Sequence, residues 1–177
     1  TDFFSIEKNT LNRKQWATKG AKYMLQLRYV QGREQSLSGS TSNRDYDVRR
    51  YHQWINLNVE AQKFYNLNKY FSFGLNANGI FNSQTLFANY TATILTMTAF
   101  DPIPDSKTFF LEEYRAPHYG SVGINAILHL NSFLDLRLDT YFFQPFRRIE
   151  RIGLDDFEFS DDFKIGSIMA GASLIFH

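Results

Sequence analysis

The sequence contains no cysteine, which excludes disulfide frameworks and thiolate metal sites. It also lacks an excess of charge of either sign. The 19 basic and 18 acidic residues give a net charge of +1, so there is no electrostatic footprint for nucleic acid. No apolar run approaches the roughly 20 residues that a membrane-spanning helix requires. The 177 residues suffice for one domain or for part of a larger one.

Aromatic residues are abundant. They make up 17% of the chain, with 18 Phe and 10 Tyr. Girdles of aromatic side chains at the two bilayer interfaces are one reason for such an excess. The mean hydropathy of −0.35 is that of a polar chain. A membrane β-barrel, however, places its apolar residues at alternate positions, so an average over the chain does not detect it.

Alternation of apolar and polar residues is clearest in 119–143. The apolar face of this stretch carries Val122, Ile124, Ala126, Leu128 and Leu130, then Leu134, Leu136, Leu138 and Phe142. The polar face of the second half carries Asp135, Arg137 and Asp139. A period of two predicts strands, and Asn131-Ser132 between them predicts a hairpin. Charges opposite a purely apolar face are typical of a wall between hydrocarbon and a wet lumen.

The same pattern predicts strands over 22–30, 51–66, 70–82 and 164–176, with a weaker one in 1–20. Glu60 lies on the polar face of 51–66. The connections alternate between long (31–50, 83–118 and 144–163) and short (66–69 and 131–132). Two prolines within 101–106 exclude a central strand there, so 83–118 is a long excursion. Outer-membrane barrels alternate short periplasmic turns with long extracellular loops. In such a barrel, 31–50 and 144–163 would be extracellular loops.

These patterns predict an all-β fold. We expect residues 1–177 to form one antiparallel transmembrane β-barrel region of the outer-membrane type, a partial barrel of about six or seven strands. The alternative is a soluble barrel or sandwich, with the apolar face as its core and the polar face in water. Both keep charge off the apolar face, so the order of the loops is the better discriminator.

Motifs of enzymes are missing from the sequence. Gly171-Ala172-Ser173 is not followed by the second glycine of a nucleophile elbow, and no glycine-rich phosphate loop opens a helix. The four histidines are scattered, which does not suggest a zinc site. Asp135 and Asp139 would lie about 13–14 Å apart along a strand, too far for a carboxylate dyad. We therefore expect no catalytic residue, cofactor or metal site in this chain.

The run FLEEYRAPHYGSVGINAILHLNSFLDLRLDTYFFQPF resembles the C-terminal barrel of the bacterial outer-membrane surface-antigen superfamily. The likeness is greatest to the barrel that follows a patatin-like phospholipase domain in Bacteroidetes-type proteins. The resemblance implies that 83–118 folds back into the barrel and presents Arg115, which pairs with Asp139. Glu60, Asp135 and Arg137 would be further lumen-facing polar residues. It also implies that this chain is an incomplete barrel, with six or seven of the sixteen strands found in the family.

The resemblance implies a location in the outer membrane of a Gram-negative bacterium, with outer-membrane lipid as a partner and no cofactor. The first functional hypothesis is a barrel segment that anchors a patatin-like acyl hydrolase. The catalytic domain, or other barrel segments, would lie outside this chain. The second is the barrel of an assembly or secretion protein of the same superfamily. The third is a small soluble lipid-binding β-barrel. An upstream nucleophile elbow would favour the first over the second.

Overall fold

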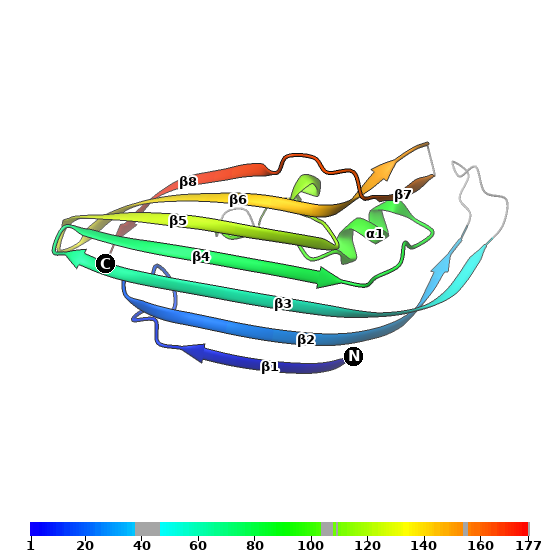
Figure 1. The fold of residues 1–177 in the computed structure, drawn as a ribbon, viewed down its shortest axis with the longest axis horizontal. Helices are drawn as coiled ribbons and strands as arrows, with labels where there is room; N and C mark the ends of the chain where they lie inside the picture. Colours follow the sequence, from blue (N-terminus) through cyan, green and yellow to red (C-terminus); the bar gives the residue numbers. More distant parts are fainter. Residues whose placement is uncertain (38–46, 104–107, 109, 154–155, 177) are drawn as a thin grey trace.

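The fold is all-β. A computed structural model describes residues 1–37, 47–103, 108, 110–153 and 156–176 (Figure 1). The strands are β1 (Asp2–Asn9), β2 (Gly20–Ser36), β3 (Val48–Asn68), β4 (Phe71–Asn82), β5 (His118–Asn131), β6 (Leu134–Arg151), β7 (Phe157–Ser160) and β8 (Ser167–Phe176). Between β4 and β5, the part of the chain that is described contains the helices α1 (Tyr90–Thr96) and η2 (Glu112–Tyr114). No helix within the described ranges is long and apolar enough to cross a membrane.

All eight strands belong to one antiparallel sheet, in the order β1-β2-β3-β4-β5-β6, with β7 and β8 both on the far side of β6. The sheet is not closed. The antiparallel all-β class predicted from the sequence is confirmed. The described residues form eight strands rather than six or seven, because β7 lies within 144–163, which the sequence marked as a loop.

The strands are longer than the sequence suggested. β2 and β3 stay paired as far as Ser36 and Val48, so both ends of the expected 31–50 loop belong to a hairpin arm. β6 likewise runs through Arg147 and Arg148 to Arg151. Charged side chains do not prevent a backbone ladder from continuing, and composition therefore placed the boundaries of these loops wrongly. Residues 38–46 and 154–155 of these loops lie outside the described residues.

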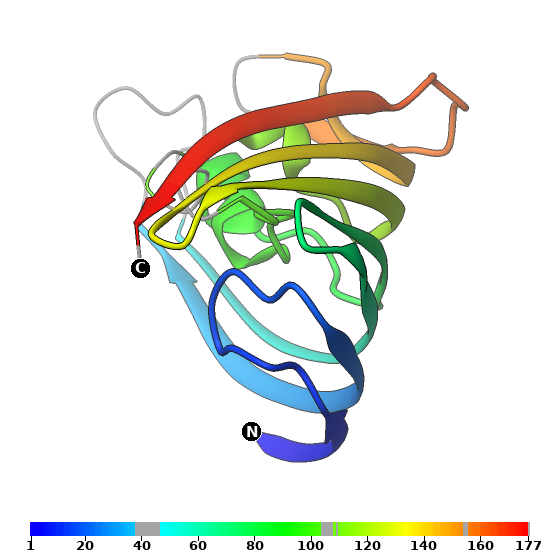
Figure 2. The ribbon, with the colours of Figure 1, turned by 90° about the vertical axis from the view of Figure 1, so that its left-hand side faces the viewer.

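The sheet curves around the segment that joins β4 to β5, and α1 lies on its concave side (Figure 2). This segment is the 83–118 excursion, which the resemblance implied would fold inward. Phe100, Ile103 and Ala116 from the segment are buried in one cluster with side chains of the sheet. The sheet residues of that cluster are Ile80, Tyr119, Tyr141, Phe143 and Met169. The core of the molecule is therefore the interface between the concave face and the inserted segment.

The connection between β1 and β2 makes a second, smaller contact with the sheet. Ala17 is buried with Phe64 and Ile127, and Leu11 packs against them. Gly20 opens β2 with a φ of 103°, a conformation that side chains disfavour. Any Cβ at Gly20 would also lie 2.1 Å from the carbonyl oxygen of Thr10. Glycine therefore allows the connection to turn tightly back to the sheet.

The two faces of the sheet have opposite burial. On the convex face, apolar side chains are exposed: Leu25, Leu27, Ile55, Val59, Leu75, Val122, Ile124, Leu128, Leu138, Phe142, Ile168 and Leu174. On the concave face, polar side chains are buried: Ser72, Asn82, Ser121, Asn125, Asp135, Arg137 and Asp139. A soluble sheet has the reverse arrangement, with its apolar face covered.

Candidate functional site

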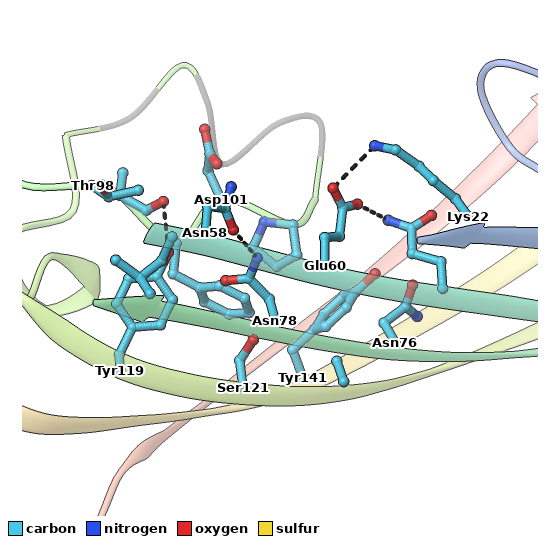
Figure 3. A pocket seen from close by; sticks show the side chains of 16 residues that line it. Lys22, Asn58, Glu60, Asn76, Asn78, Thr98, Asp101, Tyr119, Ser121 and Tyr141 are labelled. Carbon is cyan, nitrogen blue, oxygen red and sulfur yellow. Dashed lines mark hydrogen bonds and ion pairs between the residues drawn. The ribbon is translucent and has the colours of Figure 1, made fainter. Parts of the chain in front are cut away.

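A polar pocket lies on the concave face, where β3, β4 and β5 meet the inserted segment (Figure 3). Its volume is about 390 Å³. The polar side chains that line it are Lys22, Asn58, Glu60, Gln62, Asn76, Asn78, Thr98, Asp101, Tyr119, Ser121 and Tyr141. Alternation along each strand puts these residues on one face, because every second side chain points the same way.

The charges and amides of this pocket are largely paired with one another. Lys22 Nζ lies 3.0 Å from Glu60 Oε2, and Gln62 donates to the other oxygen of Glu60 at 2.6 Å. Asn78 donates to Asn58 Oδ1 at 3.0 Å (Figure 3). The Oδ1 atom of Asn78 is buried and has no hydrogen-bond partner among the described residues. Such a wall suits water or neutral polar groups rather than an ion.

Asp139 and Arg137 form a buried ion pair farther along β6. The Nε atom of Arg137 donates to Asp139 Oδ1 at 2.7 Å, and both side chains are nearly inaccessible. Asn125 also donates to Asp139. The guanidinium of Arg137 lies over the rings of Trp16 and Phe64, at 5.2 and 5.5 Å. The pair thus links the sheet to the β1–β2 connection.

Arg115 does not pair with Asp139, contrary to what the resemblance implied. Its Nη1 atom donates to the carbonyl oxygens of Met97, Leu95 and Ile94, at 3.0, 3.3 and 3.4 Å. These carbonyls end α1, where a cation is favoured by the helix dipole and by unsatisfied acceptors. Asp139 is already held by Arg137, two residues away on the same face. Arg115 therefore stabilises the inserted segment internally, since all three acceptors belong to that segment.

Further contacts near Arg115 and at the other end of α1 also stabilise the inserted segment. Its guanidinium lies 5.1 Å from the ring centroid of Phe110. At the other end of α1, Asn89 caps the helix by accepting from the backbone of Ala92 at 3.0 Å. Burial, together with the carboxylate of Glu113, raises the pKa of Tyr114 above its ordinary value. The segment thus has its own polar fastenings in addition to its apolar cluster.

Ser72, His129 and Asp135 form a hydrogen-bonded relay near the short turns of the sheet. Ser72 Oγ lies 2.8 Å from His129 Nε2, and His129 Nδ1 lies 2.8 Å from Asp135 Oδ1. A serine hydrolase uses the same order of groups. Here, however, Ser72 is 0% exposed. A nucleophile must reach its substrate, so the relay is structural: it satisfies polar groups inside the sheet.

A second histidine relay lies at the opposite end of the strands. His52 Nε2 lies 2.8 Å from Glu34 Oε2, and His52 Nδ1 lies 2.9 Å from Thr85 Oγ1. The other oxygen of Glu34 accepts from the backbone of Ala88 at 2.6 Å. This relay ties the start of the inserted segment to the β2–β3 arm, because Thr85 and Ala88 belong to the segment.

Sequence reasoning placed Glu60, Asp135, Arg137 and Asp139 on polar strand faces, and they do lie on the concave side. It missed both histidine relays. Their members come from strands that are distant in sequence, and cross-strand register is not written in any single strand. His129 shares the polar alternation of Asn125, which predicts that it points inward but does not identify Ser72 and Asp135 as its partners.

No protein-family model, curated protein or solved structure matches this chain.

Proposed function

We propose that this chain is a membrane-spanning β-barrel segment, with its convex face against lipid and its concave face lining a hydrated, partly plugged lumen. One observation carries the proposal, namely the inverted burial of the two faces. Ile124 is 51% exposed on the convex face, whereas Asn125, its neighbour in β5, is 0% exposed. A bilayer removes the cost of exposing apolar side chains, and transmembrane barrels alternate in this sense.

Two further features support the proposal. The convex face of β4, β5, β6 and β8 carries no charged residue along four stretches, as a lipid contact requires. These stretches are Phe71 to Phe81, His118 to Leu130, Leu134 to Phe142 and Ile168 to Phe176. The inserted segment fills the concave side instead of leaving the sheet to fold on itself. A small soluble lipid-binding barrel would place its apolar face inward, so the same burial counts against that alternative.

The resemblance to surface-antigen barrels extends the proposal. The segment would belong to the outer membrane of a Gram-negative bacterium and would anchor a patatin-like acyl hydrolase whose catalytic domain lies outside this chain. The barrel of an assembly or secretion protein is the second candidate. Phospholipase activity in the full-length protein that is lost when a nucleophilic serine outside this chain is replaced would support the first candidate.

Flotation with vesicles tests the membrane assignment. The protein is refolded in the presence of phosphatidylcholine vesicles, which are then washed with alkaline carbonate and centrifuged through a density gradient. A bilayer-spanning sheet remains with the floating vesicles after the wash, because its apolar face is inside the hydrocarbon. Recovery of folded protein in the aqueous fraction without detergent would contradict the proposal.

A further inference from the structure

The convex face of the β2–β3 arm changes in composition along its length in a definite order. From the middle of the strands toward the 37–47 connection, the facing pairs on this side are Leu27 with Leu57, Tyr29 with Ile55, Gln31 with Gln53, Arg33 with Tyr51, and Gln35 with Arg49. Apolar rows therefore give way to tyrosine and glutamine, and these to arginine. The arm is the part of β2 and β3 that extends beyond the other strands (Figure 1).

The length of this face fits a bilayer with a cation at each boundary. Lys63 lies on the same face toward the other end of β3, opposite Ala21. The stretch from Tyr51 to Lys63 extends about 40 Å along the strand at about 3.4 Å per residue. With a strand tilt of about 40°, it crosses about 31 Å along the bilayer normal, which is close to the thickness of the hydrocarbon core. Arg33 and Arg49 then lie at the level of lipid headgroups.

Arg33 and Arg49, here called the arginine rim, are close enough to act on one group. Arg33 faces Tyr51, and Arg49 is two residues from Tyr51 on the same strand face. Diagonal neighbours of this kind lie about 7–8 Å apart. Both side chains are exposed. Two arginine side chains carried at this backbone spacing can both reach one anion, and a phosphate accepts from both guanidinium groups.

The row next to the rim is the facing pair Gln31 and Gln53, and it presents hydrogen-bond donors. Tyr29 donates to Gln53 Oε1 at 2.9 Å, and Tyr51 donates to Gln31 Oε1 at 2.5 Å. Each glutamine thus uses its oxygen within the row, which leaves its NH₂ group, a donor, to meet a headgroup. Amphipathic tyrosines at this depth are typical of a bilayer interface.

We propose that Arg33 and Arg49 bind the phosphate of an anionic lipid headgroup at the end of the barrel where the long connections lie. The inference rests on the proposed membrane function and adds a specific lipid class to it. Phosphate on a lipid, rather than free phosphate, is the partner because the rim continues directly into the apolar rows that acyl chains would cover.

The test is a lipid titration of the protein purified in dodecyl maltoside, with bound lipid counted by native mass spectrometry. Parent protein and the double variant Arg33→Gln with Arg49→Gln are titrated with phosphatidylglycerol. We expect the double variant to bind about 30-fold more weakly, which corresponds to about 2 kcal/mol, since each basic residue near an anionic lipid surface contributes about 1 kcal/mol. Uncharged diacylglycerol is expected to show no difference between the two proteins.

The matched control is Arg28→Gln with Arg50→Gln. It removes the same charge from exposed positions of the same two strands, but on the opposite face. This control is expected to bind phosphatidylglycerol like the parent. Equal binding by rim variant and parent, or equal loss in the control, would overturn the proposal. Inorganic phosphate that competes at the concentration of the lipid phosphate would show an anion site that does not require a lipid, and would overturn it too.

The flotation experiment distinguishes a failure of the arginine rim from a failure of the proposed membrane function. If the parent does not remain with washed vesicles, the membrane function fails and the rim fails with it. If the parent remains with the vesicles but rim and control variants bind phosphatidylglycerol alike, only the arginine rim is wrong.

Discussion

The convex and concave faces of this sheet are built from the same strands, and they are stabilised in different ways. In β6, Leu138 is 45% exposed on the convex face, whereas Asp139 is 3% exposed on the concave face. Concave side chains have named partners at hydrogen-bonding distance. The apolar side chains of the convex face carry no polar group to pair and depend on the surrounding solvent. Changes on the concave face should therefore have the same effect in detergent and in lipid, and changes on the convex face should not.

The largest effect is expected from Asp139→Ala, which leaves the guanidinium of Arg137 buried without its carboxylate. Breaking one partner of a buried pair destabilises by about 3–5 kcal/mol. The measurement is urea unfolding of the refolded protein, in detergent and in vesicles. Thr140→Ala, the adjacent residue on the convex face, is the control and should change stability by less than about 0.5 kcal/mol. Equal stability of the two variants would mean that the pair is not buried as described.

Leu138→Arg comes next and tests the convex face. A cation on the lipid-facing band costs up to about 2–4 kcal/mol, the most at the bilayer midplane. The expected result is poor assembly into vesicles and lower stability there than for Leu138→Ala, the control for loss of the leucine side chain. On a water-exposed face the same change would be nearly neutral. Equal assembly of the arginine and alanine variants would contradict lipid contact at this position.

Arg115→Ala should loosen the inserted segment by about 1–3 kcal/mol, because it removes charged hydrogen bonds to the end of α1. Faster limited proteolysis within 83–117 is the readout. Arg115→Lys keeps the charge but lacks the planar fork, so it should rescue only in part.

A double-mutant cycle separates this role from the pairing implied by the family resemblance. Arg115 and Asp139 have different partners, so their effects on unfolding should add within about 0.5 kcal/mol. A coupling energy well above that value would restore the direct pair.

The smallest effect is expected from Ser72→Ala, about 1 kcal/mol, the net contribution of one hydrogen bond. The parent should not react with a fluorophosphonate probe for activated serines, since Ser72 has no exposed surface. Labelling of the parent that disappears in Ser72→Ala would convert the relay from a structural element into a nucleophile.

Much of the sheet could be predicted from the sequence. The alternation around Leu136 and Leu138 gave the hairpin of β5 and β6, and it separated apolar from charged residues correctly. The boundaries were wrong where charge was dense: the residues after Gln144 were expected to form a loop, but β6 continues to Arg151 and pairs with β7. Local composition cannot reveal a ladder whose partner strand is distant.

The prolines of the inserted segment predicted an excursion between strands, but the sequence did not predict the structure within it. α1 has the sequence YTATILT, rich in β-branched residues that disfavour helix. It forms because Asn89 caps its start, Arg115 meets its end, and Ile94 is buried. The burial of Ile94 and the bonds of Arg115 are tertiary, whereas the Asn89 cap spans three residues and does not by itself predict a helix. For the same reason the partner of Arg115 could not be derived from spacing, and resemblance to a family suggested the wrong one.

The most direct test of the account compares adjacent residues of β4 on opposite faces. The chain has no cysteine, so Ala77→Cys on the convex face and Asn76→Cys in the concave pocket can each carry a single environment-sensitive fluorophore. In vesicles, nitroxide groups on lipid acyl chains should quench the label at 77 and spare the label at 76, and iodide in water should do the reverse. Equal quenching at both positions, or quenching by iodide at 77 alone, would contradict a sheet with lipid outside and water inside.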